Sequence, residues 1–367
     1  MRFPEFTEEW KKCTIDDLCE EFKSGKNIKA DNILGEGEYP VFGGNGLRGY
    51  TDSYNHEGDY VLIGRQGALC GNVRFVTGKT YITEHAIAAK ATNDNDIRFL
   101  KSLFIQLNLG QFSDQSAQPG LAVNKLLKIE TSVPSRIEQA KIASLLSIID
   151  ERITTQNKII EDLKKLKSAI IEEHYKHTQK QKACVADLGV PFNVGNLSKE
   201  ELSETGTSCV IYGELFTTYG EIINHVESHT NKLDGMTLSK KGDLLFPSST
   251  TVDALSLIAP SAINVDNVIL GGDMFGIHIN SGFNAQYLSY YFNHLAKKQF
   301  AKYAKGSTII HLHYKDIEKA QLLLPCLVEQ NRMAACLVLL DEKIRIESSH
   351  LQSVVKQKMY LLHQMFI

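Results

Sequence analysis

Cysteines are few in this chain, and they lie far apart. Seven occur in 367 residues. Their number is odd and no Cys-x-x-Cys pair is present, so the pattern indicates neither a disulfide framework nor a zinc site. Cysteines of this kind are typical of the reducing cytoplasm, where we expect the protein. They are Cys13, Cys19, Cys70, Cys184, Cys209, Cys326 and Cys336.

Long apolar runs are also absent. No stretch of about 18 apolar residues occurs, and the first six residues lack the basic-then-apolar order of a signal peptide. We therefore expect no membrane partner. The chain is 43% hydrophobic and 23% charged, and its length suits two globular domains.

Positive charge is not in excess. The chain has 40 lysines and arginines against 43 acidic residues, a formal net charge of −3. This balance argues mildly against nucleic-acid binding, because neutralising phosphates normally needs a basic excess. A local patch would answer that objection, and Lys297, Lys298, Lys302 and Lys305 form one on a predicted helical stretch. The alternative is an ordinary solvated helix face.

Catalytic motifs are missing as well. Gly78-Lys79-Thr80 resembles the end of a phosphate-binding loop, but Val73 stands where the first glycine belongs, so we interpret it as a hairpin turn. His225 with His229, and His311 with His313, lack a nearby third ligand. Neither Gly-x-Gly-x-x-Gly nor an Asn/Asp-Pro-Pro-aromatic tetrapeptide occurs. We predict no catalysis, cofactor or metal site, and thus no methylation, cleavage or ATP hydrolysis by the chain alone.

An internal repeat organises what is present. Residues 133–143 (VPSRIEQAKIA) recur as residues 324–334 (LPCLVEQNRMA), and the match continues without a gap through 148–153 and 339–344. Pro134 and Pro325 mark the starts of two long helices, because proline is tolerated in a first turn and excluded from a helix interior. Such a repeat must be identified before any fold is proposed.

Both helices show the same heptad pattern. Apolar residues recur every 3.5 positions over more than four heptads, which is typical of a coiled coil. Both also place polar residues at the same two steps, Gln156 with Glu347 and Lys167 with Lys358, and polar seam residues fix register. We therefore predict that the helices pair with each other; the alternative is that each packs on its own domain. The predicted seam comprises Ile142, Leu146, Ile149, Ile153, Ile160, Leu163, Met333, Leu337, Leu340, Ile344, Leu351 and Val354.

A segment rich in glycine, turn residues and short apolar runs precedes each helix. Gly58–Ile63 loosely matches Gly242–Pro247, and each segment later reaches a helical stretch, at 97–109 and 285–304. The predicted order is therefore globule (1–133), helix (134–182), globule (183–324) and helix (325–367). This order predicts a fixed frame that carries two different readers.

At this level the sequence resembles the specificity subunits of type I restriction-modification systems. The resemblance covers the whole chain. Its most specific elements are Phe3-Pro4-Glu5-Phe6 with Trp10, residues 39–46 (YPVFGGNG), residues 48–51 (RGYT), residues 61–67 (VLIGRQG) and the repeated Pro-x-x-x-Glu-Gln helix starts.

The resemblance implies an α+β fold: two target-recognition domains alternate with two long conserved helices that pair as an antiparallel coiled coil. It implies that each domain reads one half of a bipartite double-stranded DNA target while the helices set the gap. The implied protein partners are two modification subunits, which form an adenine methyltransferase, and restriction subunits.

In the first domain, Arg65 and Gln66 between Gly64 and Gly67 are the strongest candidates for reading bases. Arginine can grip guanine O6 and N7, and glutamine can pair with adenine. Asn45, Arg48 and Gln118 lie in comparable polar loops. The alternative for Arg65 is an internal salt bridge.

The second domain lacks a close copy of the Gly-Arg-Gln-Gly element. Its nearest equivalents are short polar residues in turns, whose hydroxyls suit phosphates or bases; simple turn capping is the alternative. These candidates are Ser248, Ser249, Thr250, Lys305, Ser307, Thr308 and His311.

The competing function is a stand-alone dimeric DNA-binding regulator or coiled-coil scaffold without an enzyme partner. It would need its own dimer interface and a strongly basic reading helix, and the sequence offers neither clearly. Copurification with a methyltransferase separates the two functions.

Overall fold

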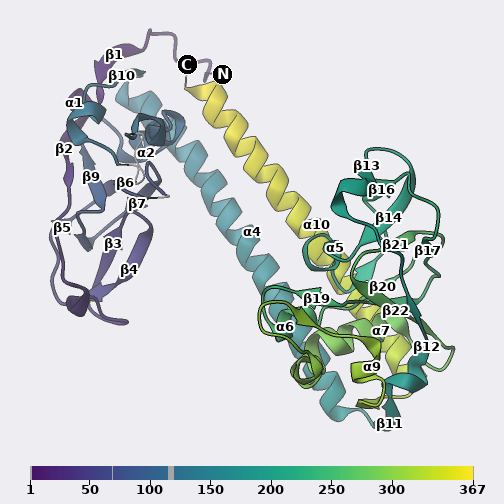
Figure 1. The fold of residues 1–367 in the computed structure, drawn as a ribbon. Coiled ribbons are helices and arrows are strands. Elements are labelled where there is room, and N and C mark those ends of the chain that lie inside the picture. The colour runs from purple at the N-terminus through teal and green to yellow at the C-terminus, as the bar shows by residue number, and fades with distance from the viewer. Residues whose placement is uncertain (1, 68, 115–119, 367) are drawn as a thin grey trace. The chain divides into compact units, whose positions relative to one another are not determined.

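The computed structural model describes residues 2–67, 69–114 and 120–366, and these divide into two units (Figure 1). The first unit spans Met1–Lys158 and Ser348–Ile367, and the second spans Ile159–Glu347. The long helices α4 (Arg136–His177) and α10 (Leu327–Met365) contribute one part to each unit.

The first unit is built on two four-stranded sheets and one strand pair. One sheet has the order β2-β9-β6-β7, with β2 Cys19–Ser24, β9 Ala86–Ala91, β6 Tyr60–Gly64 and β7 Val73–Val76. The other has the order β4-β3-β8-β5, with β4 Gly46–Thr51, β3 Tyr39–Gly43, β8 Lys79–Ile82 and β5 His56–Glu57. Strands β1 (Lys11–Thr14) and β10 (Glu130–Val133) pair antiparallel. The turn at Gly78 joins β7 to β8, which lie in different sheets, so our interpretation of it as a hairpin turn was wrong.

Helix α2 (Ile97–Gln106) covers the first of these sheets. Asp96 begins the helix by accepting hydrogen bonds from the Arg98 and Phe99 amides, a typical N-cap. Phe99 is fully buried and packs in one core with Ile63 and Ile87 of the sheet. The shorter helices are α1 (Ile15–Leu18), η1 (Ala30–Asn32), η2 (Leu109–Phe112) and α3 (Val123–Leu126).

The second unit repeats this plan with different sheets. The first sheet has the order β12-β22-β18-β20-β15: β12 Gly189–Asn193, β22 Met274–Ile279, β18 Asp243–Pro247, β20 Ser261–Ile263 and β15 Ile222–Ile223. The second has the order β13-β16-β14-β21-β17: β13 Leu202–Ser203, β16 Ser228–Thr230, β14 Thr207–Ile211, β21 Ile269–Gly271 and β17 Thr237–Leu238. Two further pairs are β11 (Gln181–Cys184) with β24 (Gln321–Leu324) and β19 (Ser249–Thr250) with β23 (Ile310–His311).

The predicted helical stretch 285–304 is broken into short pieces. It consists of α7 (Ala285–Tyr290), a π turn (Tyr291–Leu295), α8 (Lys297–Phe300) and η6 (Ala301–Tyr303). The remaining helices are η3 (Val185–Leu188), η4 (Lys199–Glu201), α5 (Glu214–Thr217), α6 (Ala254–Leu257) and α9 (Tyr314–Ile317).

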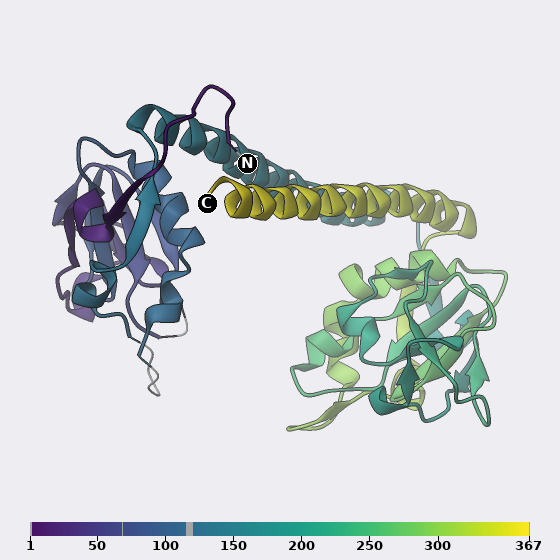
Figure 2. The same ribbon diagram turned by 90° about the horizontal axis from the view of Figure 1, so that it is seen from above.

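Helices α4 and α10 pack antiparallel in both units, as Figures 1 and 2 show. In the first unit Lys358 Nζ lies 2.5 Å from Asp150 Oδ1, and in the second Lys167 Nζ lies 2.7 Å from Asp341 Oδ1. Residue numbers therefore rise along α4 while they fall along the facing α10, so the two helices are antiparallel. The predicted α+β class with two paired long helices is confirmed.

The predicted seam residues lie on the covered side of each helix. All twelve are buried or half-buried, and the polar steps Lys167 and Lys358 form the two ion pairs just described. The repeated positions also do the same work: Ile142 and Leu146 join the first core, whereas Met333 and Leu337 join the second. Leu362 of α10 and Ile171 of α4 are a third matched pair, again one in each core.

The glutamine of the repeated Glu-Gln pair links each long helix to its domain. Buried Gln139 accepts a hydrogen bond from the Asp96 amide and donates one to the Pro134 carbonyl. Gln330 makes the same two bonds, with the Asn284 amide and the Pro325 carbonyl. Asp96 and Asn284 are the N-caps of α2 and α7, so each glutamine holds the start of a domain helix. Because the glutamine side chains bind the proline carbonyls, the residues just after each proline form a cap, and the long helices begin two residues later than the sequence suggested.

Candidate nucleic-acid interface

Three loops converge at one end of the sheets in the first unit. They follow β3, β6 and β8, and glycines allow their close approach. A Cβ on Gly44 would lie 2.7 Å from the His85 carbonyl oxygen, and one on Gly64 would lie 3.0 Å from that of Gly44. Side chains at these positions would push the loops apart, so the glycines fix where neighbouring polar residues emerge.

Three of the five predicted residues of this domain lie in these loops, and Arg48 lies on β4, which follows the first of them. Asn45, Arg48 and Gln66 are exposed, and Arg65 is half-buried. Gln118 lies outside the described residues.

Two further residues join them that the sequence analysis missed. The Arg74 guanidinium lies beside Gly46, where a Cβ would be 3.0 Å from Nη2. His85 Nδ1 lies 3.1 Å from Gln66 Oε1, within hydrogen-bonding distance. Arg74 reaches the site because β7 pairs with β6. The one sequence signal for it is its exposed position in a strand whose residues alternate between exposed and covered.

The arginines of this cluster carry uncompensated charge. In the part of the chain that the structure describes, no carboxylate lies within 4.0 Å of Arg48, Arg65 or Arg74 in an ion pair. Among the described residues, the Arg65 side chain makes one polar contact, a long one of 3.5 Å from Nε to the Leu121 carbonyl oxygen. Instead of the internal salt bridge considered above, Arg65 therefore has a guanidinium available to a ligand.

The backbone at Arg65 has a counterpart in the second unit. The Arg65 amide donates to the His85 carbonyl at 2.9 Å, and its own carbonyl accepts from the Leu121 amide at 2.9 Å. Ser248 repeats both bonds, with the Asp273 carbonyl at 2.7 Å and the Leu312 amide at 2.9 Å. The two units therefore present different side chains from one backbone position.

The predicted residues of the second unit gather beside this position. Ser249 pairs with His311 and Thr250 with Ile310 in the short ladder β19-β23. Ser307, Thr308 and His311 are exposed, whereas Ser248 and Ser249 are only 3% and 8% exposed. Lys305 Nζ is engaged with Asp316 Oδ1 at 2.5 Å. The exposed hydroxyls and His311 are thus the groups that a ligand could reach without rearrangement.

Lysines border the same region. Lys298 and Lys302 are exposed, Lys297 is half-buried, and none forms an ion pair with a described carboxylate. They follow α7 on α8 and η6. Of the four lysines of the expected basic patch, these three are therefore free of carboxylates, whereas Lys305 is paired with Asp316.

The described residues contain no group of three or more metal-ligating side chains. The His311 and His313 rings lie 6.0 Å apart, centroid to centroid, on the exposed side of the loop. Within the same residues, no helix is long and apolar enough to cross a bilayer.

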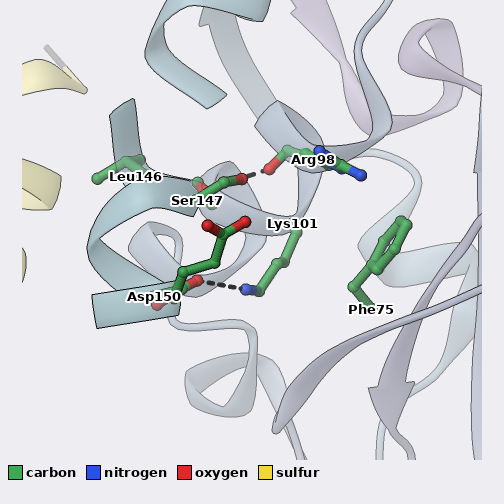
Figure 3. A pocket seen from close by; sticks show the side chains of 8 residues that line it. Phe75, Arg98, Lys101, Leu146, Ser147 and Asp150 are labelled. Carbon is green, nitrogen blue, oxygen red and sulfur yellow. Dashed lines mark hydrogen bonds and ion pairs between the residues drawn. The ribbon is translucent and has the colours of Figure 1, made fainter. Parts of the chain in front are cut away.

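A separate hollow of about 190 Å³ lies between α2 and α4 in the first unit (Figure 3). Arg98 stands over the Phe75 ring, and Lys101 points at Asp150 and donates to it at 2.7 Å. Burial opposes ionisation of Asp150, but hydrogen bonds from Lys101 and Lys358 outweigh it and hold the carboxyl pKa below its ordinary value. Asp150 is thus shared between the domain helix and α10, which favours a structural role for this hollow.

The second unit holds a larger ionic cluster at the equivalent place. Lys167 donates to Glu221 at 2.8 Å and to Asp341 at 2.7 Å, and His294 lies 2.7 Å from Glu221. Burial of Glu221 opposes its ionisation, but the contacts with His294 and Lys167 prevail and lower its pKa to about 2.

Lowering the pH should destabilise the second unit, because it protonates the Glu221 carboxylate. Since the folded pKa is about 2 and the ordinary value is 4.5, the stabilisation is complete above pH 4.5 and disappears as the pH falls toward 2. We expect a loss of about 3 kcal/mol in unfolding free energy over that window. Urea unfolding of the chain and of Glu221→Gln at several pH values measures it. The variant should show a shallower pH dependence, while the exposed control Glu161→Gln should match the parent; equal slopes for Glu221→Gln and the parent would contradict the assignment.

Comparisons with known proteins agree with this geometry. The family model described as "Type I restriction modification DNA specificity domain" matches residues 7–165 and 184–357. The chain is 41% identical over 165 residues to the type I restriction enzyme EcoprrI specificity subunit of Escherichia coli, a match that covers 44% of this chain and 40% of that one. It is 22% identical over 346 residues to a putative type I specificity subunit of Haemophilus influenzae, covering 90% and 86%.

The fold is similar to a solved structure over its full length. The type I restriction-modification S subunit from M. genitalium matches with a TM-score of 0.71 at 17% identity, covering 100% of this chain and 98% of that one.

Proposed function

Because the chain belongs to the type I restriction modification DNA specificity family, we propose that each of its β-rich domains reads one half of a bipartite DNA target. At the level of the family it is a DNA specificity subunit, a non-catalytic component of a type I restriction-modification complex. We further propose that it docks modification and restriction subunits in the cytoplasm.

One observation carries the two-reader proposal. Arg65 and Ser248 have the same pair of backbone hydrogen bonds. One is to the residue directly before the paired strand, β9 or β22, and the other is to the segment before the short helix α3 or α9. Phosphate contacts position a protein on DNA, whereas side chains at base edges specify sequence. A shared backbone frame with different side chains at its tip is what two readers of different half-sites require.

In the first domain Arg65 is the proposed base-reading residue. Its guanidinium forms no ion pair among the described residues, and the space beside Gly67 in the same loop is open. Arginine in the major groove reads guanine through O6 and N7. Arg48, Arg74 and His85 surround it and suit phosphates or neighbouring bases.

Arg65→Ala should relax recognition at one base pair of one half-site. Loss of a bidentate contact costs about 1–3 kcal/mol, or about five- to 150-fold in affinity for the correct base. The test is DNA binding and the methylated motif of the complex with its modification subunits. The matched control is Arg98→Ala. Arg98 is an arginine of the same domain on α2, and its guanidinium lies over the Phe75 ring. An unchanged motif and unchanged affinity in Arg65→Ala would remove Arg65 from the proposal.

The long helices offer two equivalent docking surfaces for the modification subunits. Ile137 and Ile148 on α4 are 76% and 61% exposed, and their repeat counterparts Val328 and Leu339 on α10 are 73% and 72% exposed. Residues 11 apart lie about three turns apart on one helix face. Each unit therefore carries one apolar patch of the same layout, which fits two copies of one partner.

Ile148→Glu and Leu339→Glu should each remove one modification subunit, and the double variant should remove both. Placing a charge where an aliphatic side chain is buried should weaken each contact by about 2 kcal/mol, roughly thirtyfold. Native mass spectrometry of the complex counts the subunits. Met359→Glu is the control, because Met359 is 60% exposed but its repeat counterpart is Ser168. Full assembly of the double variant would place docking elsewhere, and a chain that purifies with no methyltransferase would favour the stand-alone regulator.

A further inference from the structure

The loop between Lys305 and His311 is closed at its base. The Lys305 amide donates to the His311 carbonyl at 2.9 Å, and the His311 amide donates to the Lys305 carbonyl at 2.7 Å. Gly306 has φ +120°, and a Cβ there would lie 2.0 Å from the Ile309 carbonyl oxygen, so the closed form needs glycine. This closed loop carries the exposed Ser307 and Thr308 beside Ser248 and Ser249.

An ion pair holds the base of the loop to α9. Lys305 Nζ lies 2.5 Å from Asp316 Oδ1, and Asp316 is only 15% exposed while Lys305 is 76% exposed. The hydrogen bond from Lys305 lowers the pKa of the Asp316 carboxyl, with burial opposing it. Asp316 also accepts a hydrogen bond from the His313 amide, which fixes the carboxylate as a stationary anchor.

The first unit has the same anchor with its charges exchanged. The Asp114 amide donates to the Gly120 carbonyl at 3.1 Å, and Asp114 Oδ1 lies 2.5 Å from Lys125 Nζ. Asp114 and Lys125 precede Lys305 and Asp316 in the chain by the same interval that separates Pro134 from Pro325. The acid stands on the loop in one unit and on the short helix in the other.

The exchange decides what Lys305 does. A lysine at the rim of a DNA-binding loop is ordinarily assigned to phosphate. Its counterpart Asp114 would be repelled by phosphate, yet it keeps one backbone hydrogen bond at the loop base, the partner position and the ion-pair distance. The side chain at the loop base is therefore needed for the ion pair with the short helix, whichever of the two partners carries the positive charge.

We propose that Lys305 and Asp316 are positioning residues that aim the closed loop at the second half-site. This inference rests on the proposed function. An exposed pair contributes little to folding stability. Its effect is on the direction of a short loop whose Ser307 and Thr308 face the ligand.

The test compares Lys305→Asp, Asp316→Lys and the double exchange K305D/D316K, each expressed in cells together with the modification subunits. Sequencing of methylated bases then gives the preference for correct over altered second half-sites. We expect each single variant to lose about fivefold in that preference, equivalent to about 1 kcal/mol, and the double variant to regain it within about twofold. Recognition of the first half-site is the internal control for folding and assembly.

Each outcome has one meaning. Recovery in the double variant supports positioning, including the case in which both single variants are inactive. A double variant as impaired as Lys305→Asp assigns the lysine to phosphate and overturns the inference, as do single variants that match the parent. A parent complex that methylates no bipartite motif is instead a failure of the proposed function.

Discussion

Replacing residues 183–324 with the corresponding segment of a relative is expected to change one half of the recognised motif and leave the other half unchanged. The segment can be exchanged as a block because β11 and β24 pair antiparallel, with Ala183 opposite Leu322. Its two ends therefore leave and rejoin the helices side by side. The exchanged segment must keep a capping residue at 284, because the Asn284 side chain caps α7 and donates to Asn331 on α10.

The methylated motif before and after the exchange measures the result. We expect the complete loss of one old half-site and its replacement by the donor's, with the gap preserved. The reciprocal exchange of residues 1–133, closed by the β1-β10 pair, should change the other half. A change in both halves after a single exchange would show that the domains do not read independently.

Lengthening both long helices should lengthen the gap between the half-sites. Four residues inserted after Lys158 in α4 and four after Glu347 in α10 leave the internal contacts of both units in place. Each helix gains about 6 Å, because the rise is 1.5 Å per residue, and the addition of slightly more than one turn largely preserves helical phase. Since one base pair advances about 3.4 Å, the gap should grow by one or two base pairs.

The half-site sequences should not change in this variant, because the loops that carry Arg65 and Ser248 are untouched. Insertion in α4 alone is the control. It mismatches the register of the Lys167–Asp341 and Asp150–Lys358 pairs, and we expect it to abolish assembly. An active double-insertion complex with the original gap would contradict the role of the helices as the spacer.

The long helices and their pairing could be predicted from sequence because they depend on local periodicity. Ile142 and Met333 occupy the same heptad position, and two helices so similar in sequence are expected to pack in the same way in their two units. The helix starts were less predictable. Gln139 and Gln330 bind back to the proline carbonyls, so the first residues after each proline serve as caps.

The candidate site was predicted only in part, because it is assembled by strand register. Arg65 and Gln66 stand out between glycines, but Arg74 and His85 reach them through the β6-β7 and β6-β9 ladders, which sequence spacing does not reveal. The exchanged charges of Asp114–Lys125 and Lys305–Asp316 are visible in the sequence once the repeat is aligned. Their contact depends on the folding of each loop against its short helix.

The most direct test of the two-reader account is the sequence of methylated bases in DNA from cells that express this chain with its modification subunits. The account predicts two short specific elements separated by a fixed number of unspecified base pairs, with a methylated adenine in each element. A single continuous motif, or two elements whose separation varies from site to site, would contradict it.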